Sequence, residues 1–493
     1  MIATLGIVGE GIVGVGGVCA ALLLLSRALR GYVLVAQSAL PPGIVFVGSF
    51  VVLIAAGSGL LLLPAATPAD QPLSTVDAVF TITSAVSQTG LVVRPTGDGF
   101  TRFGQIIVLI WIQVGALGVL VFGALFASLL GSSLGLRATQ TLAEGTEQGW
   151  IGQISLKRLV VFIIVFTHLV ELLGAAVLYF GWPETWDGAP ADFVDAGDRM
   201  YQCVFFSVSA FCNAGFATTS NSLEGLASHW TPHVVIALLI ILGSVGFSAL
   251  YDIGRTVSAR FRGVRVQSGS LVRLSLNTKI ILTTAVIVYA MGFLSILLGE
   301  LSQTSQPIER AVLDAHFMSI NRTSGFDTIH PESMGLLSQL VLISLMFIGG
   351  SPGSVAGGVK LMALAVLAMT VYATIAGRDK ITAFNRNIPN AVVGKCATLV
   401  VLSLAVIMIV TGVLAATETQ SLDALLFESV SAFGTTGLSM GITSDLHIPS
   451  RIALIAAMFV GRVGPLALLG ALFTAAQIKR PAVAYPTESV LMY

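Results

Sequence analysis

Charged residues are scarce in this chain. Lys, Arg, Asp and Glu make up 10% of its 493 residues, whereas 55% of the residues are hydrophobic and the mean hydropathy is +0.91. This composition is too apolar for a soluble globular domain of this size, and it indicates an integral membrane protein. The formal net charge is zero, so the charge balance gives no reason to expect a nucleic-acid partner.

Cysteines are scarcer still, and none of them forms a CxxC pair. Without such spacing the sequence predicts neither a disulfide framework nor a metal site, and we interpret the cysteines as apolar fillers. The four are Cys19, Cys203, Cys212 and Cys396.

One short pattern recurs four times at intervals of 110 to 125 residues. Each copy has Ser six residues before a Gly, with Leu or Phe directly after the Gly. The copies run from Ser84 to Leu91, Ser209 to Phe216, Ser319 to Phe326 and Ser431 to Leu438. A unit repeated four times can surround one axis, and a glycine turn in each unit could ring an ion with backbone carbonyls.

Apolar stretches long enough to cross a bilayer flank each copy in pairs. They are 43–64 and 103–130, 159–182 and 233–251, 280–298 and 335–376, and 396–417 and 451–478. Two spans per repeat return the chain to the same side, so the repeats are parallel and related by an axis along the membrane normal.

The predicted fold is an all-α integral membrane protein with four span, pore-helix, span repeats around one pseudo-fourfold ion pore. The predicted units are an N-terminal helix and linker (1–40) and four pore repeats (41–135, 136–255, 256–380 and 381–493, the last with a C-terminal tail).

The segment between each pair of spans is too short to cross and predicts a re-entrant helix followed by a turn. Asp77, Asp314 and Asp423 lie near the starts of three of these segments, where an acid favours a helix N-terminus. The helix C-termini would then point at the glycines, and their partial negative charge would favour a cation there.

Loop charges predict the orientation of the chain. The loops 252–279 and 377–395 are basic and 183–200 is acidic, so the positive-inside rule makes the first two cytoplasmic and the third external. The re-entrant segments then enter from outside. Residues 2–26 form a ninth apolar stretch followed by positive charge, which favours an extra helix with Met1 outside over a peripheral segment.

The glycines of the repeated pattern are the expected selectivity filter. Backbone carbonyls can replace the hydration shell of a cation, and Gly tolerates the bend that presents them. The predicted K⁺-binding filter residues are Gly90, Gly215, Gly325 and Gly437, with their neighbours Thr89, Ala214, Ser324 and Thr436. The alternative is close helix packing by small residues.

The Gly-rich segment 349–358 interrupts the long stretch 335–376. Five glycines and Pro352 cannot stay helical, and irregular backbone at membrane depth is tolerated only against protein or a water-filled cavity. We predict an unwound gating loop below the filter rather than a simple kink; a phosphate-binding loop would need Lys directly after the last Gly, where Val359 stands. The predicted gate comprises Gly349, Gly350, Ser351, Pro352, Gly353, Ser354, Gly357, Gly358, Lys360 and Arg462.

Three further sites carry polar groups at membrane depth. Arg462 in the last span would lie near the depth of the loop, where it could neutralise carbonyl dipoles or act as a barrier to cations; the alternative is a buried ion pair. Arg322 precedes the third filter turn and would brace neighbouring loops or cap its own helix. His168 and Glu171 at i, i+3 are too few for a closed metal site, so we favour a contact between helices.

Several motifs resemble the Trk/Ktr/HKT superfamily of potassium transporters from about residue 40 to the end. The matching segments are Gln113–Gly118 with Ala116 in place of a Gly, the filter turns Asn213–Phe216, Arg322–Phe326 and Thr435–Leu438, the loop Gly349–Lys360 with Val355 in place of Thr, Gly461–Leu466, and the Ktr-type tail Ala484–Glu488 with Thr487 in place of Glu.

This resemblance implies K⁺ transport, sometimes with Na⁺, in the cytoplasmic membrane. It also implies a homodimer that associates with a cytoplasmic ring of nucleotide- and NAD-binding regulatory subunits. We expect no covalently bound cofactor. Members with Ser in the first filter turn tend to pass Na⁺, so Gly90 favours K⁺ selectivity. Two alternatives stay open: a K⁺ symporter coupled to Na⁺ or H⁺, and an intramembrane enzyme that uses His168 and Glu171.

Overall fold

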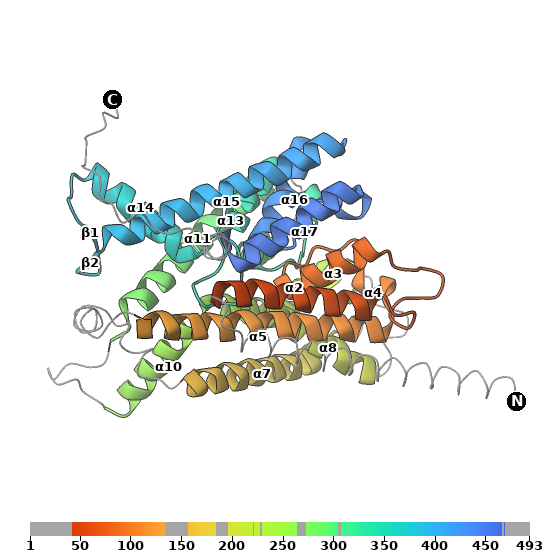
Figure 1. Ribbon diagram of the computed structural model, residues 1–493, viewed down its shortest axis with the longest axis horizontal. Helices are drawn as coiled ribbons and strands as arrows, with labels where there is room; N and C mark the ends of the chain where they lie inside the picture. Colours follow the sequence, from red (N-terminus) through yellow and green to blue (C-terminus); the bar gives the residue numbers. More distant parts are fainter. Residues whose placement is uncertain are drawn as a thin grey trace, which may run out of the picture.

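The computed structural model describes residues 42–133, 156–183, 196–219, 221–226, 229–263, 273–303, 307–465 and 468. Its principal helices follow the four predicted repeats (Figure 1). They are α2 (Pro42–Leu61), α3 (Thr75–Ser87) and α5 (Arg102–Ser133); α7 (Leu156–Gly181), α8 (Ala196–Phe211) and α9 (Trp230–Val245); α11 (Leu276–Gln303), α12 (Ile308–Ile320) and α13 (Leu336–Phe347); and α15 (Asn390–Thr417), α16 (Leu422–Gly434) and α17 (Ile448–Val463).

Further elements connect these helices. They are α4 (Thr96–Gly99), η2 (Glu224–Leu226), α10 (Phe247–Phe261), η3 (Asn321–Thr323), η4 (Pro331–Ser333), α14 (Leu361–Ile375), η5 (Thr443–Asp445) and an antiparallel hairpin of β1 (Ile381–Ala383) and β2 (Arg386–Ile388). The predicted helix over 2–26 and the tail motif lie outside the described residues.

The three helices of each repeat pack on one another, and the repeats contact their neighbours in one order. The last helix of each repeat packs against the short helix of the next: α5 on α8, α9 on α12, α13 on α16, and α17 back on α3. The contact between α17 and α3 joins the two ends of the series. The middle of the fold is therefore lined by the four short helices and the turns that follow them.

Two of the three acidic residues that were predicted to start the short helices lie in a first helical turn. Asp77 lies in the first turn of α3, where its backbone N–H donates to the Ser74 side chain at 3.1 Å, and Asp423 lies in the first turn of α16. The prediction for Asp314 is wrong. This residue lies in the middle of α12, where it is buried and paired with Arg310 at 2.8 Å, and Glu309 takes the first turn instead.

Two predicted spans are broken at glycines that the sequence analysis did not single out. The stretch 233–251 ends as α9 at Val245, and Gly246 (φ +89°) turns the chain through 98° into α10. Likewise α17 ends at Val463, before Gly464 (φ +87°). The first part of the predicted basic loop 252–279 is consequently helical.

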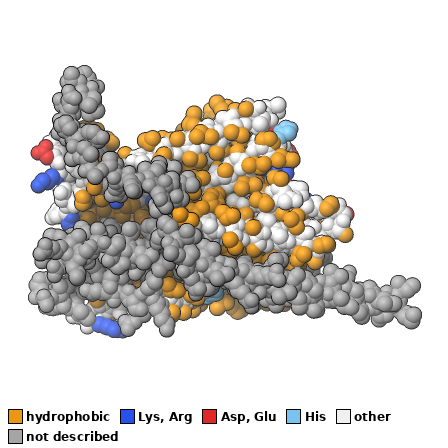
Figure 2. All heavy atoms as spheres, viewed as in Figure 1, with side chains coloured by type: hydrophobic (Ala, Val, Ile, Leu, Met, Phe, Trp, Pro, Cys, Tyr) orange, Lys and Arg blue, Asp and Glu red, His pale blue; other side chains and the backbone are white. Residues whose placement is uncertain are grey.

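Three of the described helices are long and apolar enough to cross a membrane, and the bent pair α9–α10 makes a fourth if it counts as one span. The three are α7, α11 and α15, the first helices of repeats two to four. Large apolar side chains on them are open to the surroundings, among them Leu172 (67% exposed), Leu298 (64%) and Ile409 (68%). Figure 2 shows hydrophobic side chains spread over the described surface, with charged ones toward its edges. Such a surface suits lipid rather than water.

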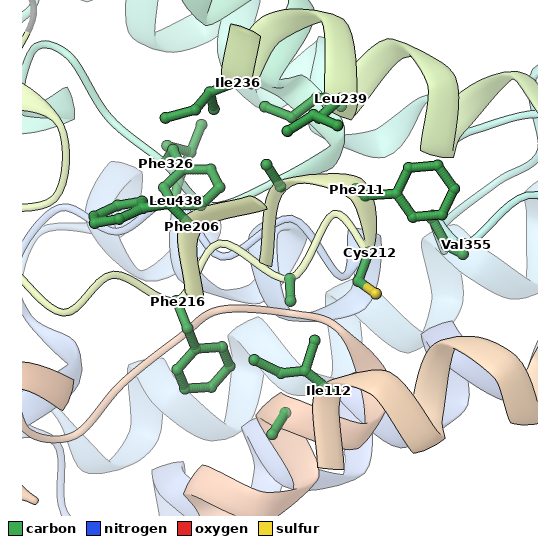
Figure 3. Close-up of a cluster of buried hydrophobic side chains, with 14 of the residues drawn as sticks. Ile112, Phe206, Phe211, Cys212, Phe216, Ile236, Leu239, Phe326, Val355 and Leu438 are labelled. Atoms are coloured by element: carbon green, nitrogen blue, oxygen red, sulfur yellow. The ribbon is translucent and has the colours of Figure 1, made fainter. Parts of the chain in front are cut away.

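The core surrounds the four turns. The Leu or Phe that follows each glycine is at most 1% exposed, and Phe216, Phe326 and Leu438 are seen among the buried side chains in Figure 3. The Phe326 ring lies 5.9 Å from that of Phe206 on α8. Packing of this side chain anchors the chain just beyond the turn, which explains why the repeated pattern carries a large apolar residue there.

Candidate functional site

The Ser of the repeated pattern makes hydrogen bonds at the C-terminal end of the short helix, near the Gly that follows it. At the ends of α3 and α16, the Ser84 and Ser431 hydroxyls accept hydrogen bonds from the backbone N–H groups of Gly90 and Gly437, both at 3.0 Å. In the second repeat the Ser209 hydroxyl donates to the Phe216 carbonyl at 2.8 Å instead. In the third repeat the Ser319 hydroxyl donates to the Tyr289 carbonyl of α11 at 2.9 Å, so the serine bonds within its own glycine turn in three of the four repeats.

Three of the turns share a strained backbone two residues before the glycine. Gln88 (φ +60°), Asn213 (φ +55°) and Thr435 (φ +50°) adopt the left-handed conformation that non-Gly residues seldom take. The third turn differs, because η3 (Asn321–Thr323) replaces the left-handed residue. Non-Gly residues in this region are held there by surrounding structure and concentrate at functional sites.

The four glycines predicted to form the filter lie against one another in a closed ring. A Cβ added to Gly90 would lie 2.5 Å from the Ala214 carbonyl oxygen, and one added to Gly215 would overlap Gly325. A Cβ on Gly325 would lie 2.9 Å from Gly437 Cα, and one on Gly437 would lie 2.8 Å from Gly90 Cα. The order of these contacts follows the order of the repeats and returns to the first. The structure thus brings together all four predicted glycines with Thr89, Ala214, Ser324 and Thr436, which are buried beside them.

Side chains link neighbouring turns. The Thr323 hydroxyl donates to Asn213 Oδ1 at 2.8 Å, which joins the third turn to the second. The Thr436 hydroxyl donates to the Arg322 carbonyl at 3.1 Å, which joins the fourth to the third. Both bonds are buried, so displacement of one turn would disturb the next.

The segment between α13 and α14 is unwound, as predicted. Ile348 and Val359 bridge its two ends, with Gly349 N–H donating to the Val359 carbonyl at 2.8 Å. Leu361 N–H donates to the Gly350 carbonyl at 3.0 Å and starts α14. These bonds hold the two ends of the loop, residues 348–360, next to each other between α13 and α14. We call this segment the intramembrane loop.

Arg462 fastens this loop to the first turn. From α17, its guanidinium donates to the Val355 carbonyl in the loop and to Gln88 Oε1 at 2.8 Å. The side chain is 5% exposed, and none of its described partners is an acid. The predicted position beside the loop is confirmed, whereas a buried ion pair does not form with any described residue.

Arg322 and Thr435 fasten the same loop from the third and fourth turns. Arg322 donates to the carbonyls of Ile348 and Gly349, so it braces a neighbouring loop rather than capping its own helix. The Thr435 hydroxyl accepts from Gly357 N–H at 3.1 Å. The predicted gate residue Lys360 donates within the loop, from Nζ to the Ala356 carbonyl at 2.6 Å.

The second repeat holds the loop through its backbone. Ser351 N–H donates to the Ser244 carbonyl at 3.0 Å, and Phe247 N–H, at the start of α10, donates to the Gly353 carbonyl at 3.1 Å. A Cβ on Gly246 would lie 2.8 Å from the Pro352 carbonyl oxygen. The sequence analysis missed these contacts and those of Gln88 and Thr435. Gln88, Asn213 and Thr435 share one position in the repeated pattern, two residues before the glycine. This shared position is the signal in the sequence that could have identified Gln88 and Thr435.

Glu171 belongs to a buried cluster behind the second turn. It accepts from Gln113 Nε2 at 3.2 Å and from Cys212 Sγ at 3.7 Å. Cys212, which we interpreted as an apolar filler, therefore makes polar contacts. His168 is exposed and its Nδ1–H donates to the Ile164 carbonyl, so His168 and Glu171 are not brought together. The described residues contain no group of three or more His, Cys, Asp or Glu that could hold a metal ion.

Membrane-length helices around four converging glycine turns define a multi-pass membrane protein of the transport class. The family model described as "TrkH: Cation transport protein" matches residues 41–478, and the chain belongs to this family. The resemblance to Trk/Ktr transporters is thereby confirmed, as is the location in the cell membrane. The family comprises transporters, so the enzyme alternative is not supported.

Curated relatives cover nearly the whole chain. The Ktr system potassium uptake protein B of Bacillus subtilis is 31% identical over 461 residues, which span 91% of this chain and 96% of the relative. The protein of the same name from Vibrio alginolyticus is 31% identical over 90% of this chain and 93% of its own. The potassium/sodium uptake protein NtpJ of Enterococcus hirae is 28% identical over 92% of this chain and 97% of its own.

A solved structure shares the fold. The crystal structure of the potassium transporter TrkH from Vibrio parahaemolyticus superposes with a TM-score of 0.68, covering 94% of this chain and 98% of that one at 17% identity.

Proposed function

We propose that this protein carries K⁺ into the cell through a filter formed at Gly90, Gly215, Gly325 and Gly437. The observation that carries the proposal is the closed ring in which each glycine abuts the next. The relatives named as potassium uptake proteins support K⁺ as the cargo. The ring would surround the axis that relates the four parallel repeats.

The chemistry of the filter follows from the backbone. Carbonyl oxygens around the ring would replace the water that K⁺ loses on entering a low-dielectric layer. The C-terminal ends of α3, α8 and α16 lead directly into the turns, and their partial negative charge adds to the attraction for a cation. No side-chain carboxylate is needed at the ring itself.

The intramembrane loop would act as the gate. It is unwound and is fastened by Arg322, Thr435 and Arg462. The Arg462 guanidinium would add an electrostatic barrier to a cation on the same path. Release of the loop from these contacts would open the path toward the cytoplasm.

Coupled transport is the second candidate. The potassium/sodium uptake protein of Enterococcus hirae favours Na⁺ as a companion ion. Association with a second copy and with a cytoplasmic ring of nucleotide- or NAD-binding regulatory subunits stays a prediction from the family resemblance.

Complementation tests the proposed function. A bacterium that lacks its own K⁺ uptake systems is grown on limiting K⁺ with and without this chain, and uptake of K⁺ and Na⁺ is measured in the same cells. We expect growth at low K⁺ and K⁺ uptake that exceeds Na⁺ uptake. Absence of rescue by a chain shown to reach the membrane, even with a co-expressed regulatory subunit, would contradict K⁺ uptake. A K⁺ flux that requires external Na⁺ would favour the symporter.

Thr435→Val tests the fastening of the loop. Valine keeps the shape of threonine and removes the acceptor of Gly357 N–H, and a buried N–H without a partner costs about 1–3 kcal/mol. The closed loop should lose stability, and K⁺ flux through purified protein in liposomes should rise several-fold. Thr435→Ser, which keeps the hydroxyl, is the control. Equal flux in the two variants would show that this bond does not hold the gate.

Glu171→Gln separates a structural from a chemical role. The glutamine oxygen can still accept from Gln113 Nε2, so we expect K⁺ uptake within about twofold of the parent. Glu171→Leu removes both acceptor atoms and should lower the preference for K⁺ over Na⁺, because the second turn loses its support. Loss of all uptake in Glu171→Gln would instead indicate proton coupling through this carboxyl.

A further inference from the structure

Two histidines that the proposed transport path does not use meet where the second and third repeats pack together. His233 lies on α9 and His316 on α12, and their rings stack with centres 6.1 Å apart. The Phe317 ring lies across His233, with centres 4.9 Å apart. The Tyr289 hydroxyl of α11 is hydrogen-bonded to His316 Nδ1 at 2.7 Å. Three helices thus surround one pair of imidazole rings.

His233 lies where an apolar side chain would pack at lower cost. It is 3% exposed in the first turn of α9, and neither ring nitrogen makes a hydrogen bond within the described residues, although the Leu313 backbone of α12 lies nearby. Burial of polar atoms without partners lowers stability, and a phenylalanine would fill the same space without that cost. The property that imidazole adds here is a change of charge, which histidine ordinarily undergoes between about pH 5 and about pH 8.

The charged groups around the pair are unfavourable to protonated rings. Arg310 of α12 acts on His233 as a nearby positive charge, and it is paired with Asp314 at 2.8 Å. Glu300 of α11 faces Asp314 in turn. Within the described residues, the contacts of the two rings include no titratable side chain from α7, α8, α13 or η3. Protonation of both rings would therefore add two positive charges beside Arg310 in a contact that largely excludes water, where repulsion is strong.

Acidification therefore favours separation of α9 from α12. Charged rings repel one another in the packed contact, whereas in an opened contact water solvates them, so protons favour the opened form. The packed contact is complete near neutral pH and weakens as the pH falls toward about 5.

The contact lies close to the second and third turns. Ile236, one turn after His233 on α9, belongs to the same buried cluster as Phe326, which follows the third glycine (Figure 3). Both α9 and α12 pack on η3, whose Arg322 braces the intramembrane loop. Separation of the two helices would therefore disturb the third turn and the brace of the loop together.

We propose that His233 and His316 form a pH-sensitive contact that lowers K⁺ uptake when the outside of the cell is acidic. The predicted orientation places the start of α9 and the helix α12 on the external side, because the basic segment 252–279 follows the other end of α9. The effect on uptake rests on the proposed function, whereas the pH sensitivity of the contact does not.

Thermal unfolding of the purified full chain tests the contact without transport. Unfolding midpoints are measured at about pH 7.5 and about pH 5.5 for the parent, His233→Phe/His316→Asn and the control His447→Gln. Phenylalanine keeps a ring on α9, and asparagine keeps an acceptor for the Tyr289 hydroxyl. His447 is an exposed histidine that pairs with Glu418 at the start of α17. We expect the parent and the control to lose stability at the acidic pH and the double variant to lose less than half as much.

Uptake of ⁸⁶Rb⁺ by intact cells of the K⁺-uptake-deficient bacterium tests the effect on transport, with acid applied outside only. Uptake by the parent and by the control should fall several-fold at the acidic pH, whereas the double variant should keep most of its uptake. The single variant His316→Asn, which leaves α9 unchanged, should lie between the two in both measurements.

Equal acid-induced losses of unfolding midpoint in the parent and both histidine variants would overturn the proposed contact. A loss of acid sensitivity in His447→Gln would also overturn it, because the exposed histidine would then carry the effect. Equal acid sensitivity of uptake in the parent and the double variant would overturn control of transport by the contact. A parent with a pH-dependent midpoint that the double variant lacks, but with no ⁸⁶Rb⁺ uptake at either pH, would support the contact and contradict the proposed function.

Discussion

Arg462→Gln is expected to raise K⁺ flux by about tenfold or more. The substitution removes a buried cation from the proposed path and the donors to the Val355 carbonyl and Gln88 Oε1. A hydrogen bond from a charged group contributes about 1.5–3 kcal/mol, and 1.4 kcal/mol corresponds to a factor of ten in rate. Unidirectional uptake of ⁸⁶Rb⁺ into liposomes that contain purified protein measures the effect.

Arg451→Gln is the matched control. Arg451 lies on the same helix, α17, but pairs with Asp77 at the beginning of α3, away from the loop. Its loss should reduce thermal stability and leave the opening of the loop unchanged. A rise in flux in Arg451→Gln equal to that in Arg462→Gln would show a general loosening of α17, and unchanged flux in Arg462→Gln would remove the arginine from the gate.

Gly437→Ala should abolish selective uptake. Gly437 has φ +92°, where a non-Gly residue costs about 1–2 kcal/mol, and the new Cβ would overlap the Thr89 carbonyl of the neighbouring turn. Because the ring is closed, displacing this contact shifts the first and fourth turns together. We expect K⁺ uptake to fall by about tenfold or more and the K⁺ to Na⁺ preference to approach unity.

Gly441→Ala separates backbone strain from filter geometry. Gly441 also has a positive φ (+81°), but the nearest atom to an added Cβ is His330 Cε1 at 3.4 Å, so there is room for the methyl group. The variant should lose stability while keeping its ion preference. If Gly441→Ala and Gly437→Ala altered the K⁺ to Na⁺ ratio alike, the ring would not be the selective element. Competition of K⁺ and Na⁺ against ⁸⁶Rb⁺ uptake provides the ratio.

The sequence predicted the parts of the fold that a local pattern specifies. The Ser and Gly spacing located the ends of α3, α8 and α16, because the serine and the glycine belong to one hydrogen-bonded turn. The glycines and Pro352 located the intramembrane loop, because no helix tolerates that composition. In both cases the residues that form the structure are close together in the chain.

Features set by distant packing were not predictable in the same way. Gly246 looks like one more small residue in an apolar run, and only its approach to Pro352 shows why the chain bends there. Asp314 looks like a helix-starting acid, but Arg310, one turn earlier on the same helix, holds it in the interior. The partner of Arg462 is Gln88, 374 positions away in the chain, and no local pattern joins the two.

Anomalous diffraction from crystals of the purified chain grown in Rb⁺ tests the central claim most directly. The account predicts a Rb⁺ peak on the axis between Gly90, Gly215, Gly325 and Gly437, which excess K⁺ displaces and Na⁺ at the same concentration does not. A peak that appears only elsewhere, for example beside Glu171, or none at any Rb⁺ concentration that supports uptake, would contradict a filter at the four glycines.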